Sequence, residues 1–494
     1  MKDKVFSTPP EIIATVLKVF TALAAGYYII LFLYIAISRI TFPIALNWVE
    51  GAVLVQTNRI LLGERLYSEP SMVYIPLVYQ PLYFYIAAAF IKVLGVGMMP
   101  IRLLSVLSTC GCILMIFLIT KKMSGAYIPA LISAGLFAAT NGIVWTWFDA
   151  GRVDMLCVFL FMTGLYFLLS DNDRGAILAG IFFALSFFSK QTTAPIVLLI
   201  FVYYFFANRK KALILMLTFS LLAGTGTLLL NYESNGLYAF YVYTLPSYHQ
   251  LGLSINGFMT FVVNGAMRPI WVALGVVLFS ILLDRKNFAR DHRHGLLLVT
   301  TIGILILSIW GTMIAWSTTN AFIPAYALIA IMFGLGLQSL QKNIEGFSSG
   351  SIRFIGSVFM LGLCLWQFSF LHYKSEDYIP TAQDFKKSHD LINFVKMADG
   401  ELLIPSENYL ALYVNKKVYY HSAALGEFNG WFGKSMPQWE KIKSEILDAI
   451  HSDEVNYIYM DQLRNRWLGM TCKKNNIFHS KSKFVPALYK MTCQ

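Results

Sequence analysis

The chain has 494 residues, of which 57% are hydrophobic and only 13% are charged, and its mean hydropathy is +0.60. Soluble domains carry about a quarter charged residues, so this composition excludes an ordinary soluble enzyme and indicates a chain mostly surrounded by lipid. The formal net charge of +12 comes from short basic runs between apolar segments. Such runs are typical of cytoplasmic loops, so we expect no nucleic-acid partner.

Apolar segments long enough to cross a membrane recur along the chain. A spanning helix needs about 20 apolar residues, and charges, Gly or Pro mark its ends. The first segment is too long for the hydrophobic part of a signal peptide, so we expect it to be retained as a helix. These criteria predict an α-helical polytopic membrane protein with about eleven transmembrane helices. The predicted segments are residues 12–37, 101–120, 126–146, 153–170, 175–190, 192–208, 212–231, 262–283, 296–314, 321–340 and 353–373.

Basic loops set the direction of the chain across the membrane. With the N-terminus in the cytoplasm, the basic runs at 121–122, 209–211 and 284–294 all fall on the cytoplasmic side. This is the distribution that the positive-inside rule requires. An odd number of spans then sends the C-terminus to the extracytoplasmic side.

Two regions do not fit simple spans. Residues 38–100 form a long first outer loop, in which 81–94 is apolar but too short to cross comfortably, so we expect a re-entrant or interfacial helix there. Residues 374–494 are much more polar and alternate short β-like runs, at 401–404, 418–420 and 455–460, with a helical pattern at 438–451. We therefore predict a transmembrane domain over 1–373 and a small extracytoplasmic α/β domain over 374–494.

The cysteines divide in the same way. Four lie within apolar segments and are most simply small core residues. Cys472 and Cys493 lie in the polar C-terminal region. In an oxidising compartment they could form a disulfide or stay free, and the sequence leaves both open.

Charged side chains at a membrane edge are costly to desolvate, which makes them candidates for function. Glu50 follows the first helix, where it could remove a proton from an acceptor hydroxyl or could simply be a loop acid or helix cap. In a helix, Asp149 and Arg152 would share a face and form a structural ion pair. Arg152 could instead bind a phosphate, since its planar group donates two hydrogen bonds at once. Lys190 lies in an outer turn, where it could bind a phosphate or only extend to the interface.

Smaller signals on the same side are His249, Arg268 and Asn320, although a lone His is more often packed or solvated than a ligand. Residues 171–173 (DND) match a metal-binding pattern of nucleotide-sugar enzymes, but they fall in a cytoplasmic turn, which favours a plain polar turn. No His/Cys spacing resembles a zinc site, and neither a Walker element nor G-x-G-x-x-G precedes a helix. We expect no cofactor; a divalent metal is possible but unsupported.

Several short motifs follow one another in a defined order, beginning with Glu50. They are LGERLY (62–67), YQPLYFY (79–85), FIKVLG (90–95), IRLLS (101–105), GRVD (151–154), SKQT (189–192) and NAFIP (320–324). The ordered set, over about 12–340, resembles the GT-C superfamily of integral-membrane glycosyltransferases. It is most similar to the branch of protein O-mannosyltransferases and aminoarabinose transferases, in its bacterial members.

The resemblance implies that a sugar is transferred from a polyprenyl-phosphate donor to a glycan, lipid or protein acceptor, at the outer face of a bacterial inner membrane. Glu50 would be the base, with inversion at the anomeric carbon. The family often has Asp or an Asp-Glu pair there, so Glu64 or Asp154 could share this role. Arg152, Lys190 and either Arg268 or Arg102 would hold the donor phosphate. The further expected site residues are Asp149, Gln191, Tyr83, His249 and Asn320.

A different class of function is also open. A transporter or flippase of a lipid-linked sugar or another anionic lipid would also have many spans and outer-face charges. Against it, the polar groups do not lie in the middle of the membrane, and interrupted helices do not recur in paired halves.

Overall fold

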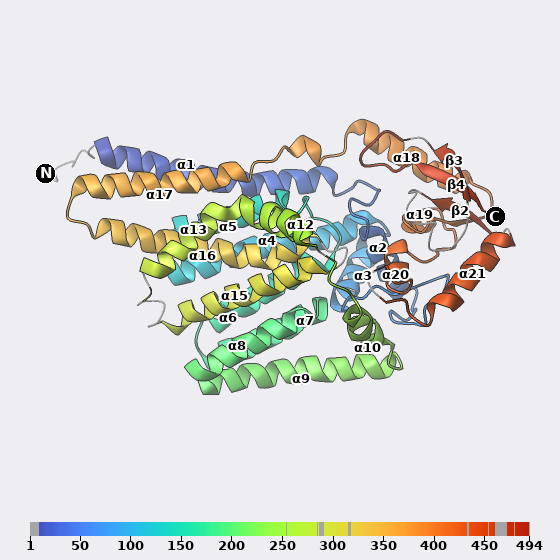
Figure 1. Ribbon diagram of the computed structural model, residues 1–494, viewed down its shortest axis with the longest axis horizontal. Coiled ribbons are helices and arrows are strands. Elements are labelled where there is room, and N and C mark those ends of the chain that lie inside the picture. Colours follow the sequence, from blue (N-terminus) through green and yellow to red (C-terminus); the bar gives the residue numbers. More distant parts are fainter. Residues whose placement is uncertain are drawn as a thin grey trace.

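Long apolar helices lie side by side along the longest axis of the protein (Figure 1). The computed structural model describes residues 9–252, 254–283, 285, 291–314, 318–431, 434–452, 454–459, 472–478 and 480–493. Within these residues, seven helices are long and apolar enough to cross a membrane, in agreement with the predicted helical membrane protein. They are Ile12–Arg39, Met98–Ser124, Arg209–Glu233, Ile255–Leu283, His292–Met313, Thr319–Glu345 and Gly350–Asp377.

The elements of the bundle include these helices and several shorter ones. Their bounds are α1 (Pro9–Arg39), α4 (Met98–Ser124), α5 (Tyr127–Ala139), η1 (Thr140–Gly142), α6 (Val153–Leu168), α7 (Asp173–Ser189), α8 (Thr193–Ala207), α9 (Arg209–Glu233), α10 (Leu237–Ala239), η2 (Phe240–Thr244), α11 (Leu245–Ser247), α12 (Ile255–Gly257), η3 (Phe258–Met267), η4 (Arg268–Ile270), α13 (Trp271–Leu283), α15 (His292–Met313), η5 (Thr319–Phe322), α16 (Ile323–Glu345) and α17 (Gly350–Phe370).

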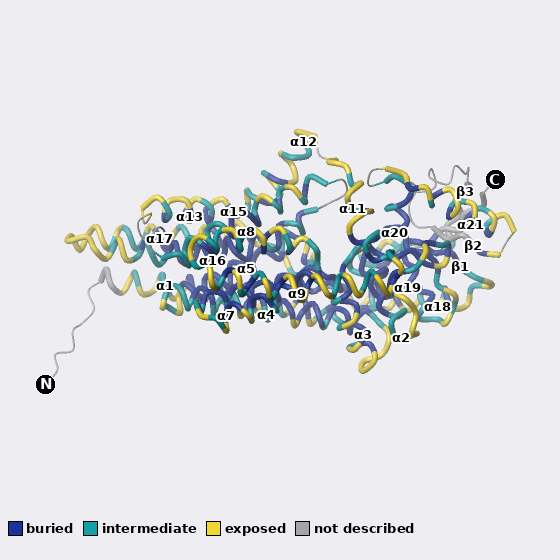
Figure 2. Tube along the Cα trace, turned by 90° about the horizontal axis from the view of Figure 1, so that it is seen from below, coloured by how far each residue is buried: buried dark blue, intermediate teal, exposed yellow. Residues whose placement is uncertain are grey.

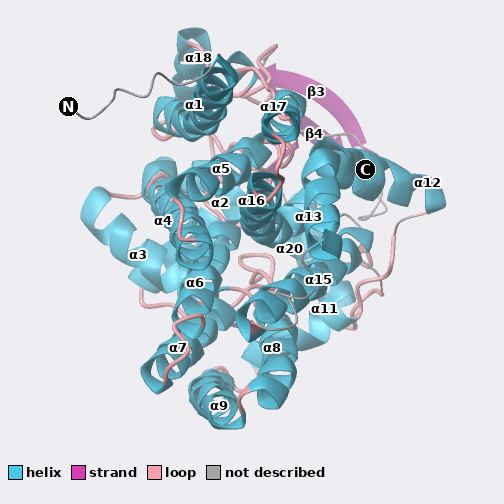
Figure 3. Cartoon of the chain, turned by 90° about the vertical axis from the view of Figure 1, so that its left-hand side faces the viewer, coloured by secondary structure: helices cyan, strands magenta, loops and turns pink. Residues whose placement is uncertain are grey.

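The bundle is organised around α16, which packs against α4, α5, α13, α15 and α17. In the end-on view, α16 lies in the middle of the helices, whereas α9 lies at the edge (Figure 3). The burial of the two helices follows these positions: α16 is largely buried and α9 is largely exposed. An exposed face rich in leucine, as on α9, suits contact with lipid rather than water.

Four of the predicted spans form shorter helices, α5 to α8, which contain 13 to 17 residues. At 1.5 Å per residue they are roughly 20 to 26 Å long, somewhat less than a hydrocarbon core of about 30 Å. Each predicted segment is helical over most of its length. The number of helices that cross the membrane stays a prediction.

The first outer loop contains two helices, α2 (Glu50–Leu61) and α3 (Leu82–Leu94). The apolar stretch that was too short to span is α3, which begins directly after Pro81 and has 13 residues. Both helices lie at the end of the bundle that carries the C-terminal region (Figure 1).

The C-terminal region combines helices with one small sheet. Strand order is β1-β2-β4-β3; β1 and β2 are parallel, and the other two pairs are antiparallel. The elements are η6 (Ser375–Asp377), α18 (Ala382–Met397), β1 (Glu401–Leu403), α19 (Tyr409–Tyr413), α20 (Ser422–Gly426), α21 (Trp439–His451), β2 (Val455–Tyr459), β3 (Cys472–Phe478) and β4 (Leu488–Cys493).

One β-like run of this region, 418–420, is not a strand. Its backbone is used elsewhere: Tyr420 N donates to Met72 O over 3.0 Å, and Asn408 Nδ2 donates to Tyr419 O over 2.9 Å. The register of β3 and β4 places Cys472 opposite Cys493. Their side chains lie outside the described ones, so the disulfide stays a prediction.

The C-terminal region shares a hydrophobic core with the first outer loop. One continuous cluster of buried side chains includes Val53 and Ile75 from the loop together with Leu391, Tyr409 and Ile442 from the C-terminal region. Figure 2 shows this buried interior around α19 and α20. The division into domains at 373 and 374 stays a prediction, but the two parts are packed closely together at this end of the bundle.

The contact between Gly51 and Tyr409 offers a test of this packing. A Cβ at Gly51 would overlap the buried Tyr409 ring, whose hydroxyl is held by Ala45 N at 2.9 Å. We expect Gly51→Ala to lower the free energy of unfolding by about 1–3 kcal/mol, measured by denaturant titration in micelles. Gly26→Ala is the matched control, because Gly26 in α1 has open space around it and alanine favours a helix. Equal stability of the two variants would contradict this account of the interface.

Candidate active site

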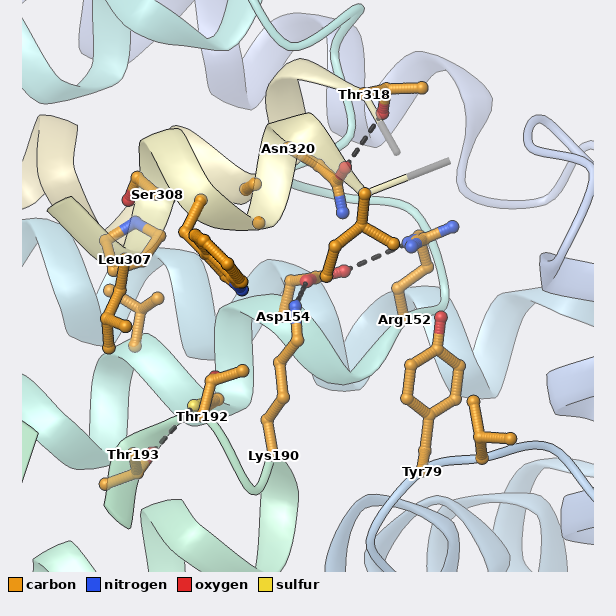
Figure 4. Close-up of a pocket in the computed structure, with 18 of the residues that line it drawn as sticks. Tyr79, Arg152, Asp154, Lys190, Thr192, Thr193, Leu307, Ser308, Thr318 and Asn320 are labelled. Atoms are coloured by element: carbon orange, nitrogen blue, oxygen red, sulfur yellow. Dashed lines mark hydrogen bonds and ion pairs between the residues drawn. The ribbon is translucent and has the colours of Figure 1, made fainter. Parts of the chain in front are cut away.

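A cavity of about 490 Å³ opens where the bundle meets the first outer loop and the C-terminal region. Its walls come from α6, α8, α15 and η5, from the loops around Trp48, Tyr79 and Lys190, and from the end of α20. One part is lined by apolar side chains such as Phe161, Ile196 and Leu307. The other part holds charged and polar groups (Figure 4).

The charged part is built around Asp154, in the first turn of α6. Arg152 Nε donates to Asp154 Oδ2 over 3.0 Å, and Lys190 Nζ donates to Asp154 Oδ1 over 2.7 Å. Close packing of α6 against α7 brings these residues together, because Arg152 immediately precedes α6 and Lys190 immediately follows α7. Figure 4 shows the three side chains pointing toward one another. Two cations around one carboxylate leave one positive charge in excess, which suits an anionic ligand.

Further contacts hold the two cations in position. Arg152 Nη1 donates to Asn47 Oδ1 over 2.8 Å, and the guanidinium lies 4.7 Å from the centre of the Trp147 ring. The Lys190 ammonium lies 2.7 Å from the Asp154 carboxylate, and this negative charge favours the protonated form of the lysine. Lys190 is therefore a fixed positive charge at neutral pH.

Glu50 lies outside this cavity and is fully buried. Its Oε1 accepts from Arg102 Nε at 2.9 Å and from Gly151 N at 2.7 Å, while Oε2 accepts from Arg102 Nη2 at 2.9 Å and from Leu46 N at 2.7 Å. Burial alone would raise the pKa of Glu50, but the charge and hydrogen bonds of Arg102 lower it below its usual value. These four contacts give the Glu50 carboxylate a structural role in this structure, and Glu50 is not among the residues that line the cavity. Its assignment as the base stays a prediction.

Arg102 is also unavailable to a phosphate. Besides Glu50, its guanidinium donates to the carbonyl oxygens of Arg39, Phe42 and Ile44, at 3.0, 2.6 and 2.7 Å. Its side chain is fully buried. The pair of Arg102 and Glu50 therefore fixes the backbone of the first outer loop.

The expected ion pair of Asp149 with Arg152 is wrong. Asp149 pairs with Arg39, at 2.7 Å from Oδ2 to Nε. The prediction assumed a helix, but residues 149–152 are not helical: they form bends, Arg152 has an extended backbone, and α6 begins only at Val153. Without helical geometry, residues three apart need not share a face.

The other expected site residues divide into two groups. His249 and Asn320 line the cavity, as do Arg152, Asp154 and Lys190. The remaining ones lie outside its lining. Tyr83 donates to Ile101 O at 2.9 Å, Gln191 donates to Val78 O at 3.3 Å, and Glu64 pairs with Arg59 at 2.6 Å. Arg268 is the first residue of η4.

Sequence reasoning missed Glu427, which follows α20. Its Oε2 lies 2.6 Å from His249 Nε2, and both residues line the cavity. The pair joins the loop after α11 to the C-terminal region. Nothing in the local sequence marks Glu427, because an acid is ordinary in a polar segment.

A metal site would require a cluster of ligand side chains. Within the described part of the chain, no group of three or more His, Cys, Asp or Glu side chains could hold a metal ion. The Asp171 carboxylate, from the metal-like motif, accepts from Lys211 at 2.7 Å and from Tyr204 at 2.9 Å. Independence from metals stays a prediction.

Comparisons with known proteins agree with the fold. Residues 76–232 match the family model described as dolichyl-phosphate-mannose-protein mannosyltransferase. No curated protein sequence matches the chain.

Solved structures match over nearly the whole chain. ArnT of Cupriavidus metallidurans in the apo state has a TM-score of 0.61 at 11% identity, covering 94% of this chain and 98% of ArnT. The same protein bound to undecaprenyl phosphate has a TM-score of 0.60 at 10% identity, with coverages of 94% and 97%. The archaeal oligosaccharyltransferase AglB of Archaeoglobus fulgidus, with an inhibitory peptide and a dolichol-phosphate, has a TM-score of 0.55 at 12% identity, with coverages of 90% and 70%. These structures show that the chain has the same fold as ArnT and AglB, and together with the family match over 76–232 they confirm the resemblance stated from the sequence.

The buried pair of Glu50 and Arg102 generates a prediction about stability. Removing one partner of a buried ion pair leaves the other uncompensated, so Glu50→Gln and Arg102→Gln should each lower the free energy of unfolding by about 3–5 kcal/mol. The double variant should lose less than the sum of the two, because the residues interact directly. Denaturant titration of the four proteins in micelles measures this, and strict additivity would contradict the pairing.

The same pair predicts how stability depends on pH. Because the pKa of Glu50 is lower in the folded protein than in the unfolded chain, its contribution is fully present above the unfolded value of about 4.3. That contribution is lost as the pH falls through the folded value. Thermal unfolding midpoints between about pH 3 and pH 7 should therefore fall less steeply on acidification in Glu50→Gln than in the unaltered protein. Parallel curves of unfolding midpoint against pH for the two proteins would show that Glu50 does not cause this pH dependence.

Proposed function

We propose that this chain, which has the fold of the GT-C membrane glycosyltransferases, transfers a sugar from a polyprenyl-phosphate donor to an acceptor hydroxyl. The observation that carries the proposal is the pair of cations, Arg152 and Lys190, at the polar end of a cavity whose other part is apolar. A lipid-linked phosphate has the same division into a charged head and an apolar tail.

The positive charge in the cavity stabilises the departing phosphate more than it stabilises the phosphate of the bound donor. A donor phosphodiester carries one negative charge, and cleavage of its bond to the sugar leaves a phosphate monoester with nearly two. Fixed cations stabilise this developing charge more than they stabilise the bound donor, and such differential binding accelerates the reaction. Asp154 holds both cations in position by accepting one hydrogen bond from each.

The apolar part of the cavity suits the prenyl chain. Phe161, Ile196, Ile304 and Leu307 line it from α6, α8 and α15. Two of the solved structures with this fold contain a polyprenyl phosphate, as undecaprenyl phosphate in ArnT and as dolichol-phosphate in AglB. Their ligands support the same class of donor for this chain.

We place the cavity at the extracytoplasmic side of the membrane, and the protein in the inner membrane of a bacterium. The basic cluster of Lys122, Lys210 and Lys211 lies near Ser170, Asp171 and Asp173, at the cytoplasmic ends of the helices by the positive-inside rule. The cavity lies at the opposite ends of α6, α7 and α8. A lipid-linked donor suits this side, because nucleotide sugars are confined to the cytoplasm.

The assignment of the phosphate site predicts the effects of two substitutions. Arg152→Ala and Lys190→Ala should each slow sugar transfer from a synthetic polyprenyl-phosphate sugar by about 10²–10³-fold, the usual loss when one stabilising donor is removed. Lys190→Arg should retain part of the activity, since it keeps the charge. Lys92→Ala is the control, because Lys92 is an exposed cation at the end of α3, outside the cavity.

Two results would contradict the proposal at different levels. Full activity of Lys190→Ala and Arg152→Ala would show that these residues do not bind the donor phosphate. The proposed reaction would be unaffected by that result. If no polyprenyl-phosphate sugar serves as a donor, and the protein moves a lipid-linked sugar across the membrane of proteoliposomes, the protein is a transporter rather than a transferase.

A further inference from the structure

The cavity contains a second ionisable pair, formed by His249 and Glu427. Glu427 Oε2 and His249 Nε2 are 2.6 Å apart, and both side chains are mostly buried, with 9% and 17% of their surface exposed. The two residues are 178 positions apart in the sequence and come from the loop after α11 and the end of α20. The C-terminal region therefore contributes a charged side chain to the cavity.

We propose that Glu427 is the catalytic base that removes the proton from the acceptor hydroxyl, and that His249 is the residue that positions it. This inference rests on the proposed function and assigns the proton transfer to a carboxylate that lines the cavity, in place of Glu50. In the proposed step, the acceptor oxygen gives its proton to the Glu427 carboxylate and forms a bond to the anomeric carbon. The bond from that carbon to the phosphate oxygen breaks, and its electron pair leaves with the polyprenyl phosphate held by Arg152 and Lys190.

The choice of Glu427 follows from the carboxylates near the site. Glu50 lies outside the cavity and accepts four hydrogen bonds. Asp154 lies in the cavity, but each of its oxygens accepts a hydrogen bond from a cation, so we assign it to holding Arg152 and Lys190. Within the described lining of the cavity, Glu427 is the other carboxylate.

The hydrogen bond to His249 fixes the direction of the carboxylate. A carboxylate can only accept, so His249 Nε2 carries the hydrogen that it donates to Glu427 Oε2. The neighbouring packing holds both residues in position. Phe428 is fully buried, and its ring centre lies 6.1 Å from that of Tyr241 and 6.2 Å from that of Phe240, in the segment that precedes His249. A general base needs this kind of fixed geometry.

The arrangement also explains why the C-terminal region must be packed against the bundle. The acceptor would enter between the cation pair, which belongs to the transmembrane helices, and Glu427, which belongs to the C-terminal region. The sugar would then lie between the leaving phosphate and the attacking hydroxyl. Attack from the side opposite the phosphate gives inversion, as the resemblance implies.

The experiment compares two nucleophiles with the full chain in lipid nanodiscs. The donor is the polyprenyl-phosphate sugar that the unaltered protein uses, and the acceptors are methanol, which must lose a proton, and azide, which carries none. We expect Glu427→Gln to slow transfer to methanol by about 10²–10⁴-fold, the usual contribution of an acid/base group. Formation of the glycosyl azide should stay within a few-fold of the unaltered protein, because that reaction needs no base.

Two further variants separate positioning from simple packing. His249→Gln keeps an N–H donor toward Glu427 and should retain more methanol transfer than His249→Ala, with azide transfer unchanged in both. Glu440→Gln removes an exposed carboxylate in the first turn of α21 and should leave both reactions unaltered.

The outcomes distinguish the inference from the function on which it rests. Methanol transfer at the full rate in Glu427→Gln would overturn the assignment of the base and leave the glycosyltransferase in place. Equal loss of methanol and azide transfer would show that Glu427 only supports the cavity, which also overturns it. If the unaltered protein consumes no donor with either nucleophile, the proposed function fails and the inference fails with it.

Discussion

The buried ion pair of Glu50 and Arg102 is the interaction on which the architecture of the site depends. It joins α2 to α4, and its remaining hydrogen bonds fix the backbone at Leu46 and at Gly151. Gly151 is followed directly by Arg152, so the same pair sets the entry of the chain into α6. Two charges removed from water are stable only when every donor and acceptor is satisfied, as it is here. The backbone beside the cavity, at Leu46 and Gly151, is therefore held in a fixed position.

The cavity itself combines two environments that a lipid-linked phosphate needs. Helices α6, α8 and α15 present apolar side chains, while the ends of α6 and α7 present Arg152 and Lys190. Low polarity around the cations strengthens their attraction for a phosphate. Asp154 orients both cations, because each of its two oxygens accepts a hydrogen bond from one of them. The C-terminal region contributes Ala423 and Glu427 to the lining of the cavity. Donor and acceptor chemistry thus come from different parts of the chain.

The sequence predicts those features that lipid imposes directly. Apolar length identifies the helical segments, and charges at their outer ends identify Arg152, Asp154 and Lys190. Pairings between distant residues follow from tertiary structure, so the sequence does not show that Glu50 is the partner of Arg102. The helical spacing assumed for Asp149 and Arg152 does not hold, because the chain is extended at Arg152 and α6 begins only after it. Glu427 was missed because a single acid in a polar segment has no periodicity or neighbour that marks it.

The most direct measurement is the structure of the full chain with a synthetic polyprenyl phosphate, determined by electron microscopy in nanodiscs. The account predicts phosphate density within hydrogen-bond distance of Arg152 and Lys190, with the prenyl chain passing along α6, α8 and α15. Phosphate density elsewhere, such as in the smaller cavity of about 120 Å³ beside Glu64 and Arg65, would contradict it.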